Sequence, residues 1–238
     1  MIRPFWLLIL FPFCFAVFVS AQSASQFDDA KADAASAESS KIAAKEEDWK
    51  LERGSSEWSL ASGYAPMQPT FFSGHKEYDT DGRKFAMVSF RYGRVIGTVK
   101  GVTYEYLFEA APYAVAINNE VGISGSSDKE YDTRRRNTFG ITIQPAGFRF
   151  VFMPRYRLKP FVQTSAGFIF SRKPIPVPQS TNYNFVGDFG GGVMFSFTRQ
   201  QVLKAGYRYY HISNMNIGEI NPGYNANMFY VDMSVFSK

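Results

Sequence analysis

The feature that most limits the possible folds is a series of eight alternating segments whose connections switch regularly between long and short. From Glu57 onward, polar and apolar residues alternate in runs bounded by Gly, Pro, Asn and Asp, as in β-strands. The predicted strands cover about 57–66, 84–97, 99–117, 137–152, 159–171, 183–198, 201–213 and 225–236. Connections that alternate long and short predict an antiparallel barrel with turns at one end and loops at the other. Eight strands can close such a barrel without leaving an edge.

Composition indicates that the barrel lies in a membrane. The chain is 45% hydrophobic and 17% aromatic, yet after residue 21 no apolar run approaches the roughly 18 residues that a spanning helix needs. Barrel strands alternate, so their average hydropathy stays low. We therefore predict an all-β, eight-stranded antiparallel transmembrane β-barrel of the bacterial outer membrane. A secreted soluble β-sandwich is the alternative.

The first residues predict export. Arg3 precedes an apolar run from Trp6 to Val19, and small residues follow up to Ala21, as in a secretory signal peptide. We expect residues 1–21 to be removed together with Cys14, the single cysteine, which excludes an internal disulfide. An exported chain is not a cytosolic enzyme.

The next segment, residues 22–56, differs in composition from the rest of the chain. It contains five Lys or Arg against eight Asp or Glu, and only two aromatic residues. Such a segment cannot bury enough apolar surface to offset its ordering, so we predict a disordered or weakly helical periplasmic segment. The barrel domain is then residues 57–238, with its N-terminus in the periplasm.

Side-chain parity within the strands predicts an apolar outer face and a charged interior. In 225–236 the odd positions are apolar, whereas the even positions include Tyr, Asp and Ser. The charged residues on the predicted inner face are Glu105, Glu109, Asp188, Lys204, Arg208 and Asp232. Because side chains fill the interior of an eight-stranded barrel, we expect these residues to form a salt-bridged plug and not a pore.

Polar residues gather where the last hairpin should reach the outer leaflet. His211 and Ser213 are two positions apart and share the outward face of the seventh strand, and Asn225 opens the eighth strand. A histidine beside a serine can act as the base of a nucleophile in acyl transfer. The alternative is that these residues simply lie in the headgroup zone, where polar side chains carry little cost.

The same region resembles a known family. Residues 211–223, His-Ile-Ser-Asn-Met-Asn-Ile-Gly-Glu-Ile-Asn-Pro-Gly, are similar to the C-terminal signature of the outer-membrane lipid A 3-O-deacylases, also called acyloxyacyl hydrolases. Residues 205–209 and 227–230 fit the same pattern, and the eight-stranded plan agrees with it. The resemblance implies an esterase that removes the acyl chain at position 3 of lipid A at the outer leaflet.

The resemblance also implies site residues. Ser213 would be the nucleophile, His211 the general base, and Asn214 an amide donor to the oxyanion. The third member in the family is an acidic residue fourteen positions after the histidine, but this chain has Asn225 there. An asparagine can orient an imidazole, although it cannot offset imidazolium charge. Asn227 and Glu219 are nearby alternatives for the third position.

Basic residues in the predicted long loops suit a phosphorylated partner such as lipid A or lipopolysaccharide, because arginine binds phosphate in a bidentate way. These residues are Lys76, Arg83, Arg134, Arg135, Arg136, Arg172 and Lys173. They could equally form a solvated surface that faces lipopolysaccharide without acting on it. Nucleic acid is excluded as a partner of an exported barrel.

The remaining expectations concern cofactors, partners and rival functions. No His, Asp and Glu cluster has metal-ligand spacing, so we expect no metal and no cofactor. The aromatic residues of the last strand are of the kind that outer-membrane assembly machinery recognises. A non-catalytic structural or adhesive barrel, and an esterase that acts on another envelope lipid, are the alternatives to the deacylase.

Overall fold

The computed structural model describes residues 36–40, 49–66, 82–122 and 133–238. The chain divides into two compact units, residues 1–41 and 42–238. Residues 36–40 form a short helix in the first unit, and no helix among the described residues is long and apolar enough to cross a membrane. The second unit contains all the strands.

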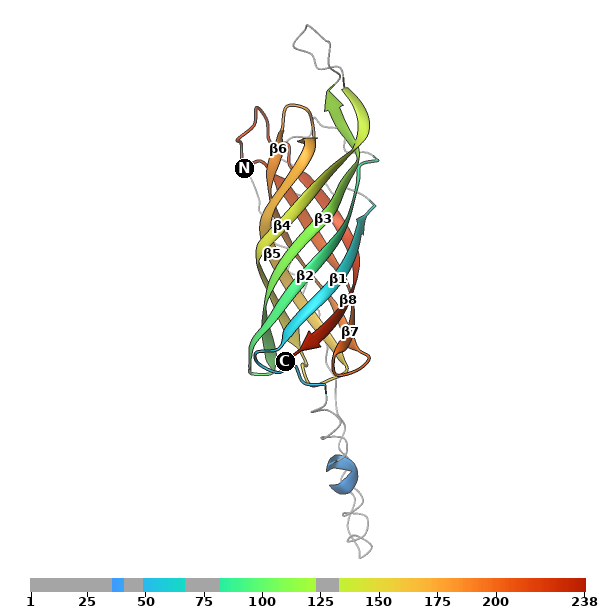
Figure 1. The fold of residues 1–238 in the computed structure, drawn as a ribbon, viewed down its shortest axis with the longest axis vertical. Helices are drawn as coiled ribbons and strands as arrows, with labels where there is room; N and C mark the ends of the chain where they lie inside the picture. Colours follow the sequence, from blue (N-terminus) through green and yellow to red (C-terminus); the bar gives the residue numbers. More distant parts are fainter. Residues whose placement is uncertain (1–35, 41–48, 67–81, 123–132) are drawn as a thin grey trace, which may run out of the picture. The chain divides into compact units, whose positions relative to one another are not determined.

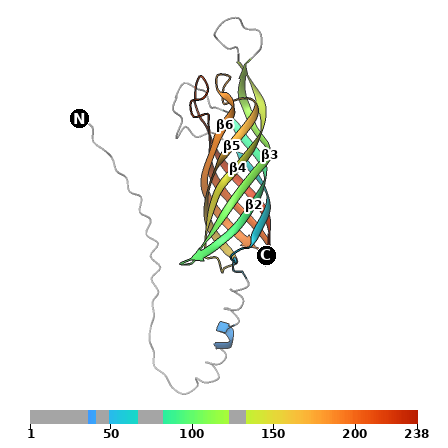
Figure 2. The same cartoon turned by 60° about the vertical axis from the view of Figure 1, so that its left-hand side comes forward.

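The strands of the second unit form a closed antiparallel barrel in sequence order (Figure 1). They are β1 (Ser56–Ala65), β2 (Lys84–Val99), β3 (Val102–Gly122), β4 (Thr133–Phe152), β5 (Leu158–Ile175), β6 (Thr181–Ser196), β7 (Gln201–Ser213) and β8 (Tyr224–Ser237). Figure 2 shows the tilted strands from a second side. The predicted fold class and strand count are therefore confirmed, and the alternative of a β-sandwich is excluded.

Three strands extend further than the sequence predicts, and this corrects the position of several basic residues. β3 and β4 continue as a paired ladder in which residues 119–122 pair with residues 133–136. Arg134, Arg135 and Arg136 thus belong to a strand and not to a loop, and so do Arg172 and Lys173 at the end of β5. Their polarity suggested a loop, but a hairpin that projects beyond the barrel can present charged residues on both faces.

The alternation of the side chains follows the predicted parity. Along β8, the odd positions Phe229, Val231, Met233 and Val235 are about half exposed, and the even positions between them are buried. β7 up to Arg208 alternates in the same sense, and the first half of β3 alternates as regularly with its even positions outward. The barrel therefore has an apolar outer wall and a polar interior.

A charge-balanced network fills the middle of the interior. Its cationic members are Arg91, Arg149, Lys159, Lys204 and Arg208, and its anionic members are Glu57, Glu105, Glu109, Asp188 and Asp232, all buried. Arg208 binds Glu109 through its two terminal guanidinium nitrogens, at 2.7 and 3.0 Å. Arg149 bridges Glu57 and Glu105 at 2.8 Å each. The predicted salt-bridged plug is present, and it also includes Glu57, Arg91, Arg149 and Lys159, which the parity analysis did not name.

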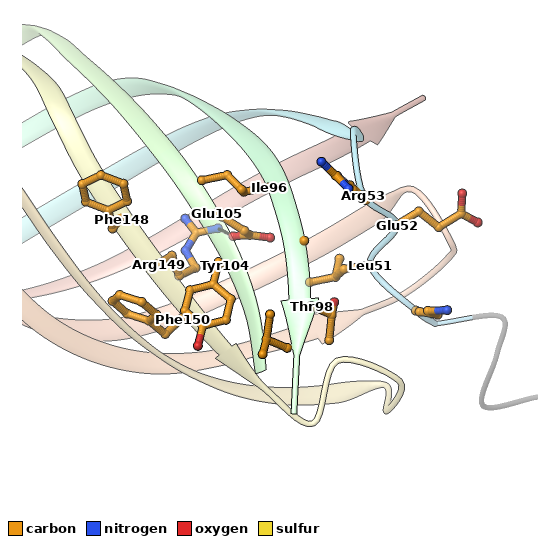
Figure 3. A pocket seen from close by; sticks show the side chains of 13 residues that line it. Leu51, Glu52, Arg53, Ile96, Thr98, Tyr104, Glu105, Phe148, Arg149 and Phe150 are labelled. Atoms are coloured by element: carbon orange, nitrogen blue, oxygen red, sulfur yellow. Dashed lines mark hydrogen bonds and ion pairs between the residues drawn. The ribbon is translucent and has the colours of Figure 1, made fainter. Parts of the chain in front are cut away.

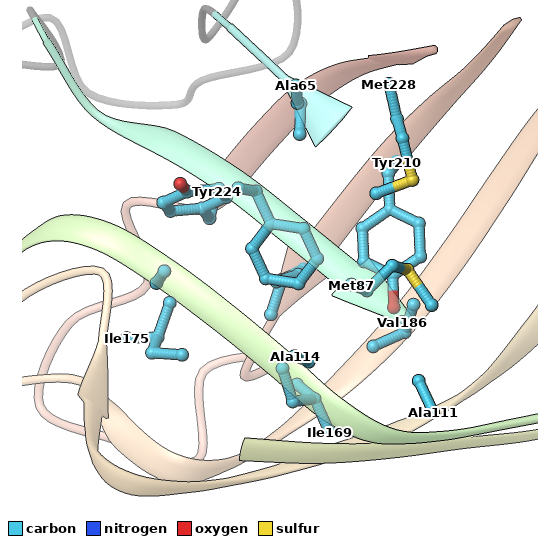
Figure 4. Packing of buried hydrophobic residues seen from close by; sticks show 14 residues of the cluster. Ala65, Met87, Ala111, Ala114, Ile169, Ile175, Val186, Tyr210, Tyr224 and Met228 are labelled. Atoms are coloured by element: carbon cyan, nitrogen blue, oxygen red, sulfur yellow. The ribbon is translucent and has the colours of Figure 1, made fainter. Parts of the chain in front are cut away.

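Two apolar clusters enclose this network from its two ends. At the loop end, fourteen side chains pack together, among them Phe85, Tyr210, Tyr224 and Ile175 (Figure 4). At the turn end, the second cluster includes Phe161, Phe236 and Leu51. Leu51 precedes β1, so residues 49–55, which we expected to be part of the N-terminal segment, are folded against the barrel. The interior is closed at both ends by packed side chains.

The buried network generates a prediction about stability. Replacing Glu109 by Gln removes the charge that Arg91 and Arg208 share. We expect the free energy of unfolding to fall by about 3–5 kcal/mol, because one partner of a buried ion pair is then left uncompensated. A urea titration of protein refolded into lipid vesicles measures this change. Glu52→Gln, which breaks an exposed pair with Lys238, is the control and should leave the titration nearly unchanged. Equal stability of Glu109→Gln and the parent protein would contradict the prediction.

Candidate active site

The candidate site lies on the hairpin of β7 and β8, near the loop end of the barrel. His211 and Asn225 are direct cross-strand partners. Ser213 is the last residue of β7, two positions after His211 and on the same face of the strand. Both His211 and Ser213 are partly exposed, in agreement with their predicted outward orientation. The register of one hairpin thus brings the three predicted residues to one place.

Asn225 is the residue that contacts the imidazole. Its Oδ1 lies 2.6 Å from His211 Nδ1, and its side chain is buried. An amide oxygen can only accept a hydrogen bond, so in the neutral ring this contact places the proton on Nδ1 and leaves Nε2 unprotonated. That tautomer is the one that a general base needs.

Gly223 fits closely against Cε1 of the same ring. A Cβ at this position would be 3.3 Å from His211 Cε1, and the backbone has a φ of +69°. Glycine satisfies both requirements, since it tolerates positive φ and adds no side chain. The turn before β8 therefore helps to hold the imidazole in place.

The two alternatives for the third position do not contact the histidine. Asn227 Oδ1 accepts a hydrogen bond from the Tyr207 hydroxyl at 2.5 Å. Glu219 is exposed in the connection between β7 and β8, and no described contact joins it to His211. Asn225 is consequently the neighbour of the imidazole.

Ser213 is held by an asparagine that the sequence analysis did not name. Asn221 Nδ2 donates to Ser213 Oγ at 2.9 Å, and the backbone N–H of Met215 donates to the same oxygen at 3.1 Å. Among the described contacts, no hydrogen bond joins Ser213 to His211. The hydroxyl is therefore oriented toward the loop, beside two N–H donors.

The side chain of Asn214, which the resemblance implied as a donor to the oxyanion, bonds groups other than Ser213 in this structure. Its side chain is fully buried, and its Nδ2 donates to Ile220 O at 2.8 Å and to Ser180 Oγ at 3.2 Å. Its Oδ1 accepts from the backbone N–H of Asn216 at 2.9 Å. The amide is thus engaged at both ends, by the loop itself and by Ser180 of the connection between β5 and β6, whereas Asn221 lies at Ser213. The only signal for Asn221 was its position in an Asn-Pro-Gly turn, eight residues after the serine.

The predicted phosphate contacts separate into four groups. Lys76 lies outside the described residues. Arg134, Arg135 and Arg136 belong to β4, which is four strands from β8 around the closed barrel, so the structure does not bring them to the site. Arg83, expected in a solvated loop, is instead buried and paired with Glu120 at 2.7 Å. Arg172 and Lys173, at the end of β5, are exposed and nearer to the hairpin.

The hollows of the surface differ in their position and in the side chains that line them. One of about 890 Å³ lies at the turn end, next to Tyr104 and Phe150 (Figure 3). Its two carboxylates, Glu105 and Glu52, are paired with Arg149 and Lys238. Another hollow, of about 710 Å³, lies on the outer wall below the hairpin. No cluster of three metal-ligating side chains occurs in the part of the chain that the structure describes.

The second hollow is largely apolar and lies on the same hairpin as the candidate site, separated from it by the pair of Tyr209 and Asn227. It is lined by Gly63, Tyr64, Gly206, Tyr207, Phe229 and Val231, from β1, β7 and β8. Gly206 and Tyr207 precede His211 on the same strand. The hollow therefore continues the outward face of the site along the wall.

These observations define the class of the molecule: a closed eight-stranded barrel that carries a serine, a histidine and two asparagines on the outer rim of its last hairpin. The family comparison agrees with that description. The model of the lipid A 3-O-deacylase (PagL) family matches residues 101–234, and the chain belongs to this family of outer-membrane β-barrels.

Solved structures of three barrels are similar to this chain at low sequence identity. The outer-membrane enzyme PagL is 16% identical, with a TM-score of 0.45, over 74% of this chain and 97% of that one. The attachment invasion locus protein Ail of Yersinia pestis is 11% identical, with a TM-score of 0.41, over 78% and 100%. Neisserial surface protein A is 11% identical, with a TM-score of 0.42, over 76% and 96%. No curated protein sequence matches the chain.

The contact between Asn225 and His211 generates a prediction. Asn225→Asp supplies a carboxylate that can offset the charge of the imidazolium, so Ser213 should become more reactive. We expect its rate of labelling by a fluorophosphonate to rise roughly ten-fold or more, since the reverse change costs up to about 10⁴ in another serine hydrolase. Asn227→Asp, two positions along the same strand, is the matched control and should not accelerate labelling. An unchanged or slower rate in Asn225→Asp would show that Asn225 is not the orienting residue.

Proposed function

We propose that this protein is a lipid A 3-O-deacylase, a serine esterase that hydrolyses the acyl ester at position 3 of lipid A in the outer leaflet. The observation that carries the proposal is the 2.6 Å contact of His211 Nδ1 with Asn225 Oδ1, two residues from an outward-facing serine. Membership of the lipid A 3-O-deacylase family supports the choice of substrate.

The proposed reaction begins when Ser213 Oγ attacks the acyl carbonyl while His211 Nε2 takes its proton. The tetrahedral intermediate collapses, and His211 returns the proton to the departing sugar oxygen. A water molecule then releases the fatty acid from Ser213 by the same base catalysis. Asn225 keeps the imidazole in the required tautomer throughout both halves.

Rotation of the serine prepares the site for attack. Residues two apart on one strand face are separated by about 6.6 Å along the chain, so the Ser213 hydroxyl can turn from the loop toward the imidazole. The same rotation releases the Nδ2 donor of Asn221 and the N–H of Met215, which both bond the hydroxyl beforehand. We assign these two groups to the oxyanion, because fixed N–H donors stabilise the charge that develops there.

The surroundings of the hairpin suit an amphiphilic substrate. The hollow on the outer wall is lined by apolar side chains and could hold an acyl chain that leaves the ester along the barrel wall. Arg172 and Lys173 are exposed above the wall at the end of β5, and we assign them to the phosphates of the sugar. This arrangement needs the loops outside the cell and the N-terminus in the periplasm.

The central prediction concerns the product. Incubation of lipid A with the refolded protein should remove one 3-hydroxyacyl chain, and Ser213→Ala should abolish the loss because no nucleophile remains. Mass spectrometry of the lipid measures both results. A properly folded barrel that leaves the mass of lipid A unchanged would contradict the proposal. That result would favour a structural barrel, for which the amide at Asn225 is the best argument. Release of fatty acid from a phospholipid, but not from lipid A, would favour an esterase that acts on another envelope lipid.

A second prediction tests the oxyanion assignment. Asn221→Asp keeps the size of the side chain but replaces the donor with a negative charge beside Ser213. We expect kcat to fall by about 10²–10³, with little change in KM, because the lost contact acts in the transition state. Asn216→Asp is the control, because the hydrogen bond that Asn216 donates to Asn214 Oδ1 uses only its backbone N–H. Parental kcat in Asn221→Asp would remove Asn221 from the mechanism.

A further inference from the structure

Residues 174–181, which comprise the end of β5, its connection to β6 and the first residue of β6, fold inward at the loop end of the barrel. Ile175 and Val177 are 1% exposed, and Ile175 belongs to the apolar cluster with Phe85 and Tyr224 (Figure 4). These partners come from β2 and β8, on either side of β1 in the closed barrel. We call residues 174–181 the mouth segment.

One side of the mouth segment is held by polar side chains near the start of β2 and the end of β3. Arg83 donates to the carbonyl oxygen of Pro176 at 3.1 Å and pairs with Glu120 at 2.7 Å. Asn119 Nδ2 donates to the carbonyl oxygen of Pro174 at 2.8 Å. Arg83 and Asn119 are both essentially inaccessible to solvent, at 1% and 0% exposure. Two backbone carbonyls of the segment are therefore fixed by buried donors.

The other side of the mouth segment contacts the loop that follows Ser213. Asn214 Nδ2 donates to Ser180 Oγ at 3.2 Å. Gly218 lies so close that a Cβ there would be 3.0 Å from Thr181 Cγ2 and 3.3 Å from Gln179 O. Three consecutive residues of the segment thus form a surface against which the loop rests.

The contacts continue from this surface to the reacting oxygen. Asn221 bonds both Asn214 and Ser213. The backbone N–H of Asn214 donates to Asn221 Oδ1 at 3.2 Å. Asn221 in turn donates to Ser213 Oγ at 2.9 Å. Each step is a hydrogen bond or a close contact between buried or half-buried groups. A displacement of the mouth segment would therefore displace the donors around Ser213.

We propose that Arg83 is a positioning residue for the reaction, acting through the mouth segment to hold the loop of Asn214 and Asn221 at Ser213. This proposal rests on the proposed function for its substrate. Arg83 touches neither the substrate nor a reacting atom. A neutral donor at this buried position could also bond the carbonyl oxygen of Pro176. The guanidinium differs because its planar set of N–H donors bonds that oxygen and Glu120 at the same time.

The test is the kinetics of Arg83→Gln in the full-length refolded barrel. We expect kcat for lipid A to fall about ten- to hundred-fold, because small displacements of catalytic groups have effects of this size. KM should remain within about two-fold of the parent, since the outer-wall hollow is untouched. Arg83→Lys keeps the charge beside Glu120 and should recover part of kcat, and Asn119→Ala should lower kcat in the same way.

The matched control is Arg157→Gln at the opposite end of the barrel. Arg157 Nε also donates to a backbone carbonyl, that of Ser196 at 2.9 Å, but no described contact links it to the hairpin of Ser213. Thermal unfolding of each variant shows how much stability is lost. Parental kcat in folded Arg83→Gln, or an equal decrease in Arg157→Gln, would overturn the proposal. If Arg83→Gln does not fold, kcat of Arg83→Lys and Asn119→Ala is compared with that of the parent instead, and parental kcat in both variants would overturn the proposal.

Failure of the proposed function is distinguishable from failure of this inference. If the parent protein does not cleave lipid A, the rate at which a fluorophosphonate labels Ser213 replaces kcat as the measurement. Slower labelling in Arg83→Gln than in Arg157→Gln supports the positioning role without reference to lipid A. Equal labelling rates in the two variants, or no labelling of Ser213 in any of them, would reject it.

Discussion

The structure depends on keeping ten charged side chains inside a cylinder whose outer wall is apolar. Five cations and five anions neutralise one another there, and several of their pairs connect strands that are not neighbours in the sheet. Glu57 of β1, for example, bonds Arg149 of β4 and Lys204 of β7. Such pairs can form only when the sheet is closed. The network therefore links the closure of the barrel to the neutrality of its interior, and the apolar clusters at both ends keep water away from it.

A rigid cylinder suits the site because the reacting groups lie on its rim. The cross-strand register of β7 and β8 places His211 opposite Asn225, so their contact is determined by the sheet and not by a loop. Ser213 stands where the sheet ends, and its surroundings are supplied by the connection to β8. The site thus combines a base held by the barrel with a nucleophile and donors held by loop contacts.

Most of the fold could be predicted from the sequence because alternation and turn spacing are local signals. They located all eight strands and the inner face of β7 and β8, and they failed where charged residues continued a ladder, as at Arg134–Arg136. The pair of His211 and Asn225 followed from strand parity and the resemblance. Asn221 and Arg83 could not be found in this way, because their importance comes from loop contacts between distant residues. Asn214 was assigned to the oxyanion by resemblance, whereas its amide bonds Ser180 and Ile220.

The amide at Asn225 has a consequence that a carboxylate in its place would not have. A carboxylate accepts hydrogen bonds from both of its oxygens, so it favours the same imidazole tautomer whichever way it is turned. An amide has an accepting end and a donating end. A half-turn of the Asn225 side chain would present Nδ2 to His211 Nδ1, move the ring proton to Nε2 and leave Ser213 without a base. In this protein one torsion angle therefore decides whether the histidine can accept a proton from the serine.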